Sequence, residues 1–213
     1  MLNIVDAIRK MCEPEQGFVE LFDKEKSFGK LCELTDERKS LELFEKLFYG
    51  KARNNLIELI NDSYQYKVYE KKILDELSSD GLSAQDSILA LEIFYKTFGY
   101  PGYRDMDMDI VKEFVSYDSG NFKSIYNGET INGQEYGVGI RKNYYEGKSC
   151  GFDECVWING KMLGYCYALD IEFMAFETKK YGFVLNDYYI GKMKEKYSDG
   201  EEEYLDGKLL IIK

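Results

Sequence analysis

The sequence predicts an α+β protein, in which an N-terminal α-helical bundle is followed by a C-terminal antiparallel β-meander of hairpins. Two observations lead to this fold class. Over roughly the first hundred residues, Leu, Ile and Phe recur at helical spacing and glycine is kept mainly to boundaries. After a bridging segment at 103–120, Gly and Tyr become frequent and apolar residues alternate, as they do along strands. We therefore expect a helical domain over 1–117 and a β-hairpin array over 118–213.

Four amphipathic helices are predicted in the first domain from their apolar faces. In chain order, these faces consist of Leu41, Phe44 and Phe48, of Leu56, Leu59 and Ile60, of Tyr66, Tyr69, Ile73 and Leu77, and of Ile88, Leu91, Tyr95 and Phe98. Gly50 is a suitable stop for the first helix, because glycine ends helices readily. Ser83 can cap the backbone amides at the start of the last helix, and the turn sequence at 99–102 ends it.

Asn-Gly pairs mark the strand ends in the second domain. The pairs at 132–133 and 159–160 favour type I′ hairpin turns, in which both central residues adopt a positive φ angle. The Asp-Gly pairs at 199–200 and 206–207 are weaker signals of the same kind. Residues 209–212 are predicted to form a last apolar strand, which has to be covered to avoid pairing at the sheet edge. We therefore expect consecutive hairpins.

An internal repeat links two of these hairpins. A shift of 27 residues places the pair 132–133 on 159–160 and Gly137 on Gly164. The same shift aligns glycines with cysteines, Gly128 with Cys155 and Gly139 with Cys166. These two cysteines are therefore expected to be small buried residues. A second register, at intervals of 22 residues, links Tyr145, Tyr167 and Tyr189.

The hairpins resemble the MORN repeat, whose pattern is Tyr-x-Gly, then Asn-Gly, then Gly-x-Gly. The first copy matches this pattern at Tyr126, Gly128, Glu129, Asn132, Gly133, Gly137 and Gly139. The second copy has Asp153 at the tyrosine position and keeps Trp157, Asn159, Gly160, Lys161 and Gly164, and the third keeps Tyr189 and Gly191. The resemblance covers about residues 122–207 and implies stacked β-hairpins that serve chiefly as interaction surfaces, with lipid binding proposed for some members. Gly137 and Gly139 would then leave a slot that a neighbouring aromatic ring fills.

The helical half is similar to an all-α module that often precedes MORN, WG or kinase domains in bacterial proteins. The similarity rests on the segments 55–60, 73–83 and 94–99. It implies a bacterial or phage origin and no particular activity.

Composition excludes several functional classes. The formal net charge is −11, from 28 basic and 39 acidic residues, which argues against binding to nucleic acid or anionic membranes. The absence of histidine removes Ser-His-Asp and Cys-His catalysis and His-ligated metal sites. No run approaches the roughly 18 apolar residues of a membrane-spanning helix, and no signal peptide is visible. Five cysteines at irregular spacing fit reduced thiols in the cytoplasm.

Three motifs that could carry chemistry have simpler explanations. The acids at 105–109 lack the glycine and glutamate of an EF-hand loop and fit a helix N-terminus. The glycines at 128–139 miss the dinucleotide and Walker fingerprints and fit hairpins. Cys150, Cys155 and Cys166 would need Cys12 or Cys32 as a fourth zinc ligand, and they fit buried thiols. No catalytic residue, cofactor or metal site is therefore predicted.

The preferred hypothesis is a non-enzymatic, cytoplasmic scaffold that binds a protein partner through the aromatic face of its sheet, because Tyr and Trp are common interface anchors. The candidate partner-binding residues are Tyr126, Tyr144, Tyr145, Trp157, Tyr188 and Tyr189. The alternative is a small anionic ligand such as a nucleotide, held with help from Arg141, Lys142 or Lys148. A further alternative is a carboxylate-based enzyme, which would need a cleft with paired acids of raised pKa.

Overall fold

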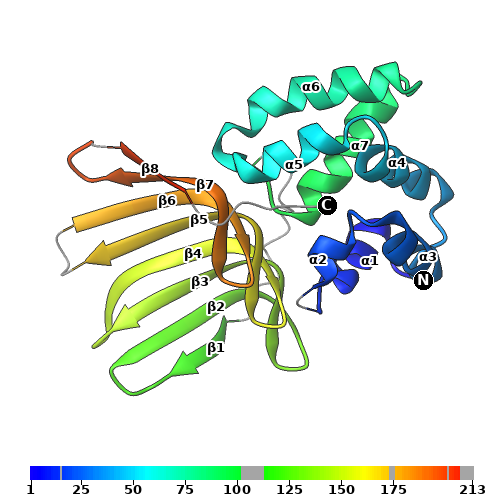
Figure 1. Cartoon of the computed structure of the whole chain (residues 1–213). Helices are drawn as coiled ribbons and strands as arrows, with labels where there is room; N and C mark the ends of the chain where they lie inside the picture. The colour runs from blue at the N-terminus through cyan, green and yellow to red at the C-terminus, as the bar shows by residue number, and fades with distance from the viewer. Residues whose placement is uncertain (15, 102–112, 173–175, 201, 207–213) are drawn as a thin grey trace. The chain divides into compact units, whose positions relative to one another are not determined.

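The computed structural model describes residues 1–14, 16–101, 113–172, 176–200 and 202–206 (Figure 1). The chain folds into two compact units, the first helical and the second a β-sheet, which divide close to residue 103. The predicted α+β class is confirmed. The sheet begins before residue 118, because β1 (Glu113–Asp118) already belongs to it. The acids at 105–109 and the strand predicted at 209–212 lie outside the described residues.

The described part of the first unit contains seven α-helices and a short 3-10 helix. They are α1 (Ile4–Met11), α2 (Gly17–Glu20), α3 (Lys24–Leu34), α4 (Arg38–Tyr49), α5 (Arg53–Asn61), η1 (Ser63–Gln65), α6 (Tyr66–Ser79) and α7 (Ala84–Thr97). The four predicted helices correspond to α4 to α7, whereas the sequence pattern did not single out α1 to α3. Over the described ranges, no helix is long and apolar enough to cross a membrane.

Both ends of α7 follow the capping chemistry of the sequence. The Ser83 hydroxyl accepts a hydrogen bond from the Asp86 backbone N–H at 3.1 Å, as predicted for the helix start. At the other end, Gly99 has a φ angle of 67°, a left-handed conformation that glycine adopts without strain. Asp23 caps α3 as Ser83 caps α7, and accepts from the Glu25 N–H at 3.2 Å. These boundaries are therefore encoded locally.

Aromatic rings form much of the core of the helical unit. Phe44 and Phe48 of α4 stack with their ring centroids 4.2 Å apart, and Phe48 lies 6.1 Å from Phe94 of α7. The prediction for α7 is wrong at Ile88, which is 48% exposed. The buried face of this helix runs through Ser87 and Phe94 instead. One residue rotates a helix by about 100°, so Ile88 lies beside the buried face rather than within it.

The described part of the second unit is one antiparallel sheet of eight strands, which lie in the order of the sequence. After β1 come β2 (Phe122–Ile131), β3 (Gln134–Tyr145), β4 (Lys148–Ile158), β5 (Lys161–Glu172), β6 (Phe176–Leu185), β7 (Tyr188–Tyr197) and β8 (Glu202–Asp206). Figure 1 shows that each strand lies beside the next one in the chain. This is the predicted meander.

The 27-residue repeat runs through three hairpins of the sheet. Their turns begin at Asn132, Asn159 and Asn186, which have φ angles of 52°, 52° and 51°. Glycines with positive φ angles follow at the same distance from each turn, at Gly137, Gly164 and Gly191. The repeat is therefore confirmed for the first two hairpins. It also extends to a third, in which Asp187 replaces the glycine of the turn and has a φ angle of 67°.

The register that links tyrosines at intervals of 22 residues is wrong. Tyr145 ends β3, Tyr167 lies inside β5, and Tyr189 is the second residue of β7, so the three do not occupy equivalent places. Tyr189 also lies in the second strand of its hairpin, whereas Tyr126 lies in the first strand of its own. The spacing of these tyrosines therefore does not correspond to a structural repeat.

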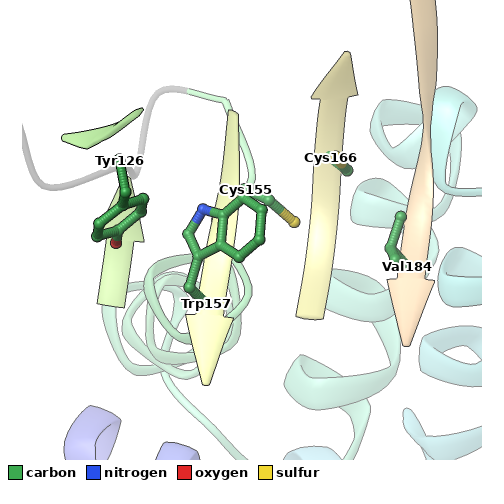
Figure 2. Packing of buried hydrophobic residues seen from close by; sticks show 5 residues of the cluster. All are labelled: Tyr126, Cys155, Trp157, Cys166 and Val184. Atoms are coloured by element: carbon green, nitrogen blue, oxygen red, sulfur yellow. The ribbon is translucent and has the colours of Figure 1, made fainter. Parts of the chain in front are cut away.

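The Tyr126 ring lies in a slot formed by two glycines. An added Cβ would lie 2.2 Å from the Tyr126 hydroxyl at Gly139 of β3, and 2.3 Å from it at Gly128. Across β3, the ring meets Trp157 edge to face at a centroid distance of 5.7 Å. Figure 2 shows both rings on one side of the sheet, which we call the Tyr126 face, with Cys155, Cys166 and Val184. The predicted glycine slot is confirmed at Gly139 and is wrong at Gly137, where an added Cβ would meet only Glu129 Oε2, because the second glycine of the slot is Gly128. Both cysteines are buried.

Candidate functional site

Three of the six aromatic residues predicted to bind a partner belong to the core cluster of Figure 2 or pack against it. Tyr126 and Trp157 have no exposed surface. Tyr189 packs against the same cluster, and burial raises the pKa of its hydroxyl. Tyr126 and Trp157 therefore cannot contact a partner in the folded state, which corrects the prediction for these two. The physical reason is that the Tyr126 ring fills the space left by Gly128 and Gly139, and Trp157 packs edge to face against that ring.

The other three predicted aromatics do not form a common patch. Tyr188 is 75% exposed at the start of β7, Tyr145 is 48% exposed at the end of β3, and Tyr144 is half-buried. The turns at 132–133, 159–160 and 186–187 close one end of the strands, and the turn at 146–147 closes the other. Tyr145 and Tyr188 therefore lie at opposite ends of the strands.

A cavity of about 610 Å³ lies on the Tyr126 face. Its walls come from the first three strands of the sheet and from the turns at 132–133 and 159–160. The lining residues are Phe114, Ser116, Tyr117, Phe122, Ser124, Gly133, Gln134, Glu135, Arg141, Asn143 and Gly160. Its volume is within the range of small-molecule sites, and its lining mixes aromatic with convergent polar groups.

Arg141 is the centre of a charged network at this cavity. The strand register places Tyr126 of β2, Arg141 of β3 and Asp153 of β4 side by side. The Arg141 guanidinium lies 3.5 Å from Glu135 Oε2 and 3.6 Å from Asp153 Oδ2. It also lies 4.2 Å from the centroid of the Trp157 ring, a cation–π contact. Two carboxylates and an aromatic ring thus hold the guanidinium in place.

Asn143 extends the network with both ends of its amide. Its Nδ2 donates to Asp153 Oδ2 at 3.2 Å, and its Oδ1 accepts from the Ser124 hydroxyl at 2.7 Å. Burial raises the pKa of Asp153, and the Arg141 charge and the Asn143 hydrogen bond oppose that rise. The polar wall of the cavity is therefore a connected set of side chains.

Glu135 is the unusual member of this set. Its side chain is 4% exposed, yet Oε1 has no hydrogen-bond partner among the residues that the structure describes. Burial raises the pKa of the carboxyl group, and the Arg141 charge and a hydrogen bond from the Ser116 side chain to the carboxyl group oppose that rise. Buried polar atoms nearly always have a partner, and an unpaired one costs about 1–3 kcal/mol. Glu135 is therefore a residue of the cavity lining whose buried oxygen lacks the partner that such atoms usually have.

Of the three cations predicted to hold an anion, Arg141 alone is in the cavity lining. Lys142 is its neighbour in β3 and therefore points to the opposite face of the sheet. Lys148 is exposed at the start of β4. Within the described ranges, no three His, Cys, Asp or Glu side chains are grouped so that they could hold a metal ion.

The sequence prediction missed Glu135, Asn143 and Asp153 as site residues. The sequence did mark Asp153, because the second repeat has this acid where the first repeat has a tyrosine. Glu135 had no such mark, since it follows an Asn-Gly turn and resembles an exposed hairpin residue. A scan against protein-family models and a search of the curated proteins each find no match to this chain. The chemistry of the cavity therefore has to be deduced from its own side chains.

Proposed function

We propose that this chain is a non-enzymatic binding protein, which holds a small polar ligand in the cavity at Glu135 and Arg141. The proposal rests on Glu135, a residue of the cavity lining whose buried Oε1 has no hydrogen-bond partner among the described residues. A ligand that donates a hydrogen bond to this oxygen removes the cost of leaving it unpaired.

The side chains around Glu135 are already held in place, which favours binding. Arg141 is fixed between two carboxylates, and Asn143 is bonded at both ends of its amide. A preformed site loses little side-chain freedom when a ligand enters, so more of the contact energy becomes affinity. This arrangement supports the ligand-binding alternative better than it supports a partner surface built on Tyr126 and Trp157.

A thermal shift screen against a library of small metabolites tests the proposal, because a ligand that binds the folded state raises Tm. The test variant is Glu135→Leu, which removes the acceptor and keeps a side chain of similar size. Lys142→Gln is the matched control, one residue along β3 from Arg141 and on the opposite face. We expect compounds that stabilise the wild type and the control but not Glu135→Leu. A screen without any Glu135-dependent shift would refute the proposal.

A carboxylate-based enzyme is the second candidate, favoured by one specific observation. Glu135 and Asp153 both have a raised pKa and both contact Arg141. A carboxyl group with a raised pKa can act as a general acid or base. Mass spectrometry of each stabilising compound after incubation distinguishes the two functions. Unchanged compound supports binding, and conversion that Glu135→Leu abolishes supports catalysis.

A protein-binding scaffold remains a third candidate, now on the opposite face of the sheet. Phe152, Tyr167 and Tyr181 form a half-buried aromatic row there, with centroid distances of 5.4 Å and 4.9 Å between successive rings. The resemblance of the hairpins to MORN repeats supports such a role. We expect Tyr167→Ala to abolish capture of a protein partner and Tyr188→Ala to preserve it. Equal capture by both variants would exclude this row as the contact.

The cytoplasm is the proposed location of the protein. All five cysteines are free thiols, as is usual in a reducing compartment. Fractionation of the source cells, followed by detection of the chain with an antibody, checks this proposal.

A further inference from the structure

The charges at the cavity do not balance. Glu135 and Asp153 both contact the single guanidinium of Arg141, so one negative charge remains when both acids are ionised. Asp187, in the turn between β6 and β7, adds a further negative charge that acts on Glu135. Lys142 does not compensate, because it points to the other face. The field at the cavity therefore attracts cations and repels anions.

The unsatisfied group at the cavity is a hydrogen-bond acceptor. Arg141 faces two carboxylates, and the Asn143 amide donates and accepts within the network. Glu135 Oε1, in contrast, has no partner within the described part of the chain. An ionised carboxylate oxygen can only accept hydrogen bonds. The complementary ligand group is therefore an N–H or O–H donor.

Aromatic side chains form the apolar part of the lining. Phe114, Tyr117 and Phe122 all line the cavity, and the rings of Tyr117 and Phe122 are 6.0 Å apart. The face of an aromatic ring attracts an ammonium or guanidinium group and also accommodates a carbon chain. The cavity thus combines negative charge, a lining residue with an unpaired buried acceptor, and aromatic walls.

We infer that the ligand of this cavity is a small organic amine in its protonated form, which donates its N–H groups to Glu135 Oε1. The inference rests on the proposed function and adds the chemical class of the ligand. It differs from the anionic ligand that the sequence suggested, because Glu135 and Asp153 already neutralise Arg141. The carbon chain of the amine lies against the aromatic wall.

Amine binding should depend on pH through Glu135. The charged groups that act on this carboxyl are Arg141 of β3, Asp153 of β4 and Asp187 of the turn between β6 and β7. Burial raises the pKa of the Glu135 carboxyl group, so this group becomes mostly ionised only when the pH rises above the raised pKa. Affinity for a protonated amine therefore increases with pH over this range. Glu135→Gln removes the titrating group and should remove most of this dependence.

Isothermal titration calorimetry on the full chain tests the inference. The amine probes are spermidine and putrescine, tetramethylammonium is a cation with neither N–H nor O–H groups, and inorganic phosphate and AMP are anions. Glu135→Gln removes the charge and keeps the size, and Lys142→Gln is the matched control. We expect saturable amine binding that is at least about tenfold weaker in Glu135→Gln and unchanged in Lys142→Gln. Unaltered Trp157 fluorescence shows that both variants are folded.

The outcomes separate the inference from the proposed function. Absence of amine binding, tetramethylammonium binding as tight as that of spermidine, or amine binding that Glu135→Gln leaves unchanged overturns the inference. If anions or neutral library compounds bind and depend on Glu135 while amines do not bind, the inference is wrong and the proposed function stands. If no compound binds in a way that depends on Glu135, both are wrong.

Discussion

Replacement of Gly139 by alanine tests the packing of the Tyr126 ring directly. The added Cβ would lie 2.2 Å from the Tyr126 hydroxyl and 2.4 Å from two ring carbons, whereas ordinary contact begins at 3.4 Å. The ring therefore has to retreat by about 1 Å. Tyr126 is fully buried and meets Trp157 on its other side, so a retreat displaces further core residues.

Two costs add up in this variant. Overpacking of a close-packed core destabilises by about 1–3 kcal/mol. Movement of the ring also disturbs the buried hydrogen bond from the Tyr126 hydroxyl to the Tyr136 carbonyl, which is 2.8 Å long and contributes about 1 kcal/mol. We therefore expect Gly139→Ala to lower the free energy of unfolding of the β unit by about 2–4 kcal/mol.

Urea unfolding followed by Trp157 fluorescence measures this loss, because the single tryptophan of the chain lies in the affected cluster. Gly29→Ala in α3 is the control, since an added Cβ there meets nothing within 4 Å. In a Tyr126→Leu background, the cost of Gly139→Ala should fall below about 1 kcal/mol. A loss below about 0.5 kcal/mol in the single variant, or an equal loss in both backgrounds, would refute the reasoning.

Two hydrogen bonds and the burial of two kinds of side chain give four further predictions. Tyr126→Phe removes the hydrogen bond to the Tyr136 carbonyl and should cost about 1 kcal/mol in the same urea assay, and an unchanged midpoint would contradict this. Ser83→Ala removes the cap of α7 and should destabilise the helical unit by about 1 kcal/mol, measured by far-UV circular dichroism with exposed Ser78→Ala as a control. Burial raises the pKa of Glu135 above its ordinary value of 4.5, so the folded state keeps this proton longer than the unfolded state. Wild-type stability should therefore decrease relative to Glu135→Gln as the pH rises through the raised pKa, and a difference that does not change between about pH 4 and pH 8 would count against this. In thiol labelling, exposed Cys32 should react in the folded protein, whereas buried Cys12, Cys155 and Cys166 should react only after unfolding, and equal rates at all five cysteines would disprove it.

Features that depend on neighbouring residues were predictable from the sequence. The Ser83 cap and the turns at 132–133 and 159–160 follow from local hydrogen bonding and backbone conformation. The glycine slot also follows locally, since alternate residues share a face of a strand. The third turn escaped prediction because Asp187 takes the place of glycine and adopts a positive φ angle all the same.

Features that depend on register between strands were not predictable. The position of Arg141 between Glu135 and Asp153 requires both the pairing of β3 with β4 and the local shift in the pairing of β2 with β3. A shift of the strand register by one residue would turn each side chain of the strand to the other face of the sheet. The residues next to a polar side chain do not determine which face it takes. The burial of Trp157 likewise depends on its contact with Tyr126 across an intervening strand.

The nearest-neighbour order of the strands bears on how the sheet forms during synthesis. Each strand from β1 to β8 pairs with the next one in the chain, so no pairing has to close a long loop. Short loops lose less entropy on closure, and low contact order speeds folding. A domain emerges from the ribosome with its N-terminal part first. We therefore expect β2 and β3 to pair, and to become resistant to protease, before the last strands of this chain have been translated.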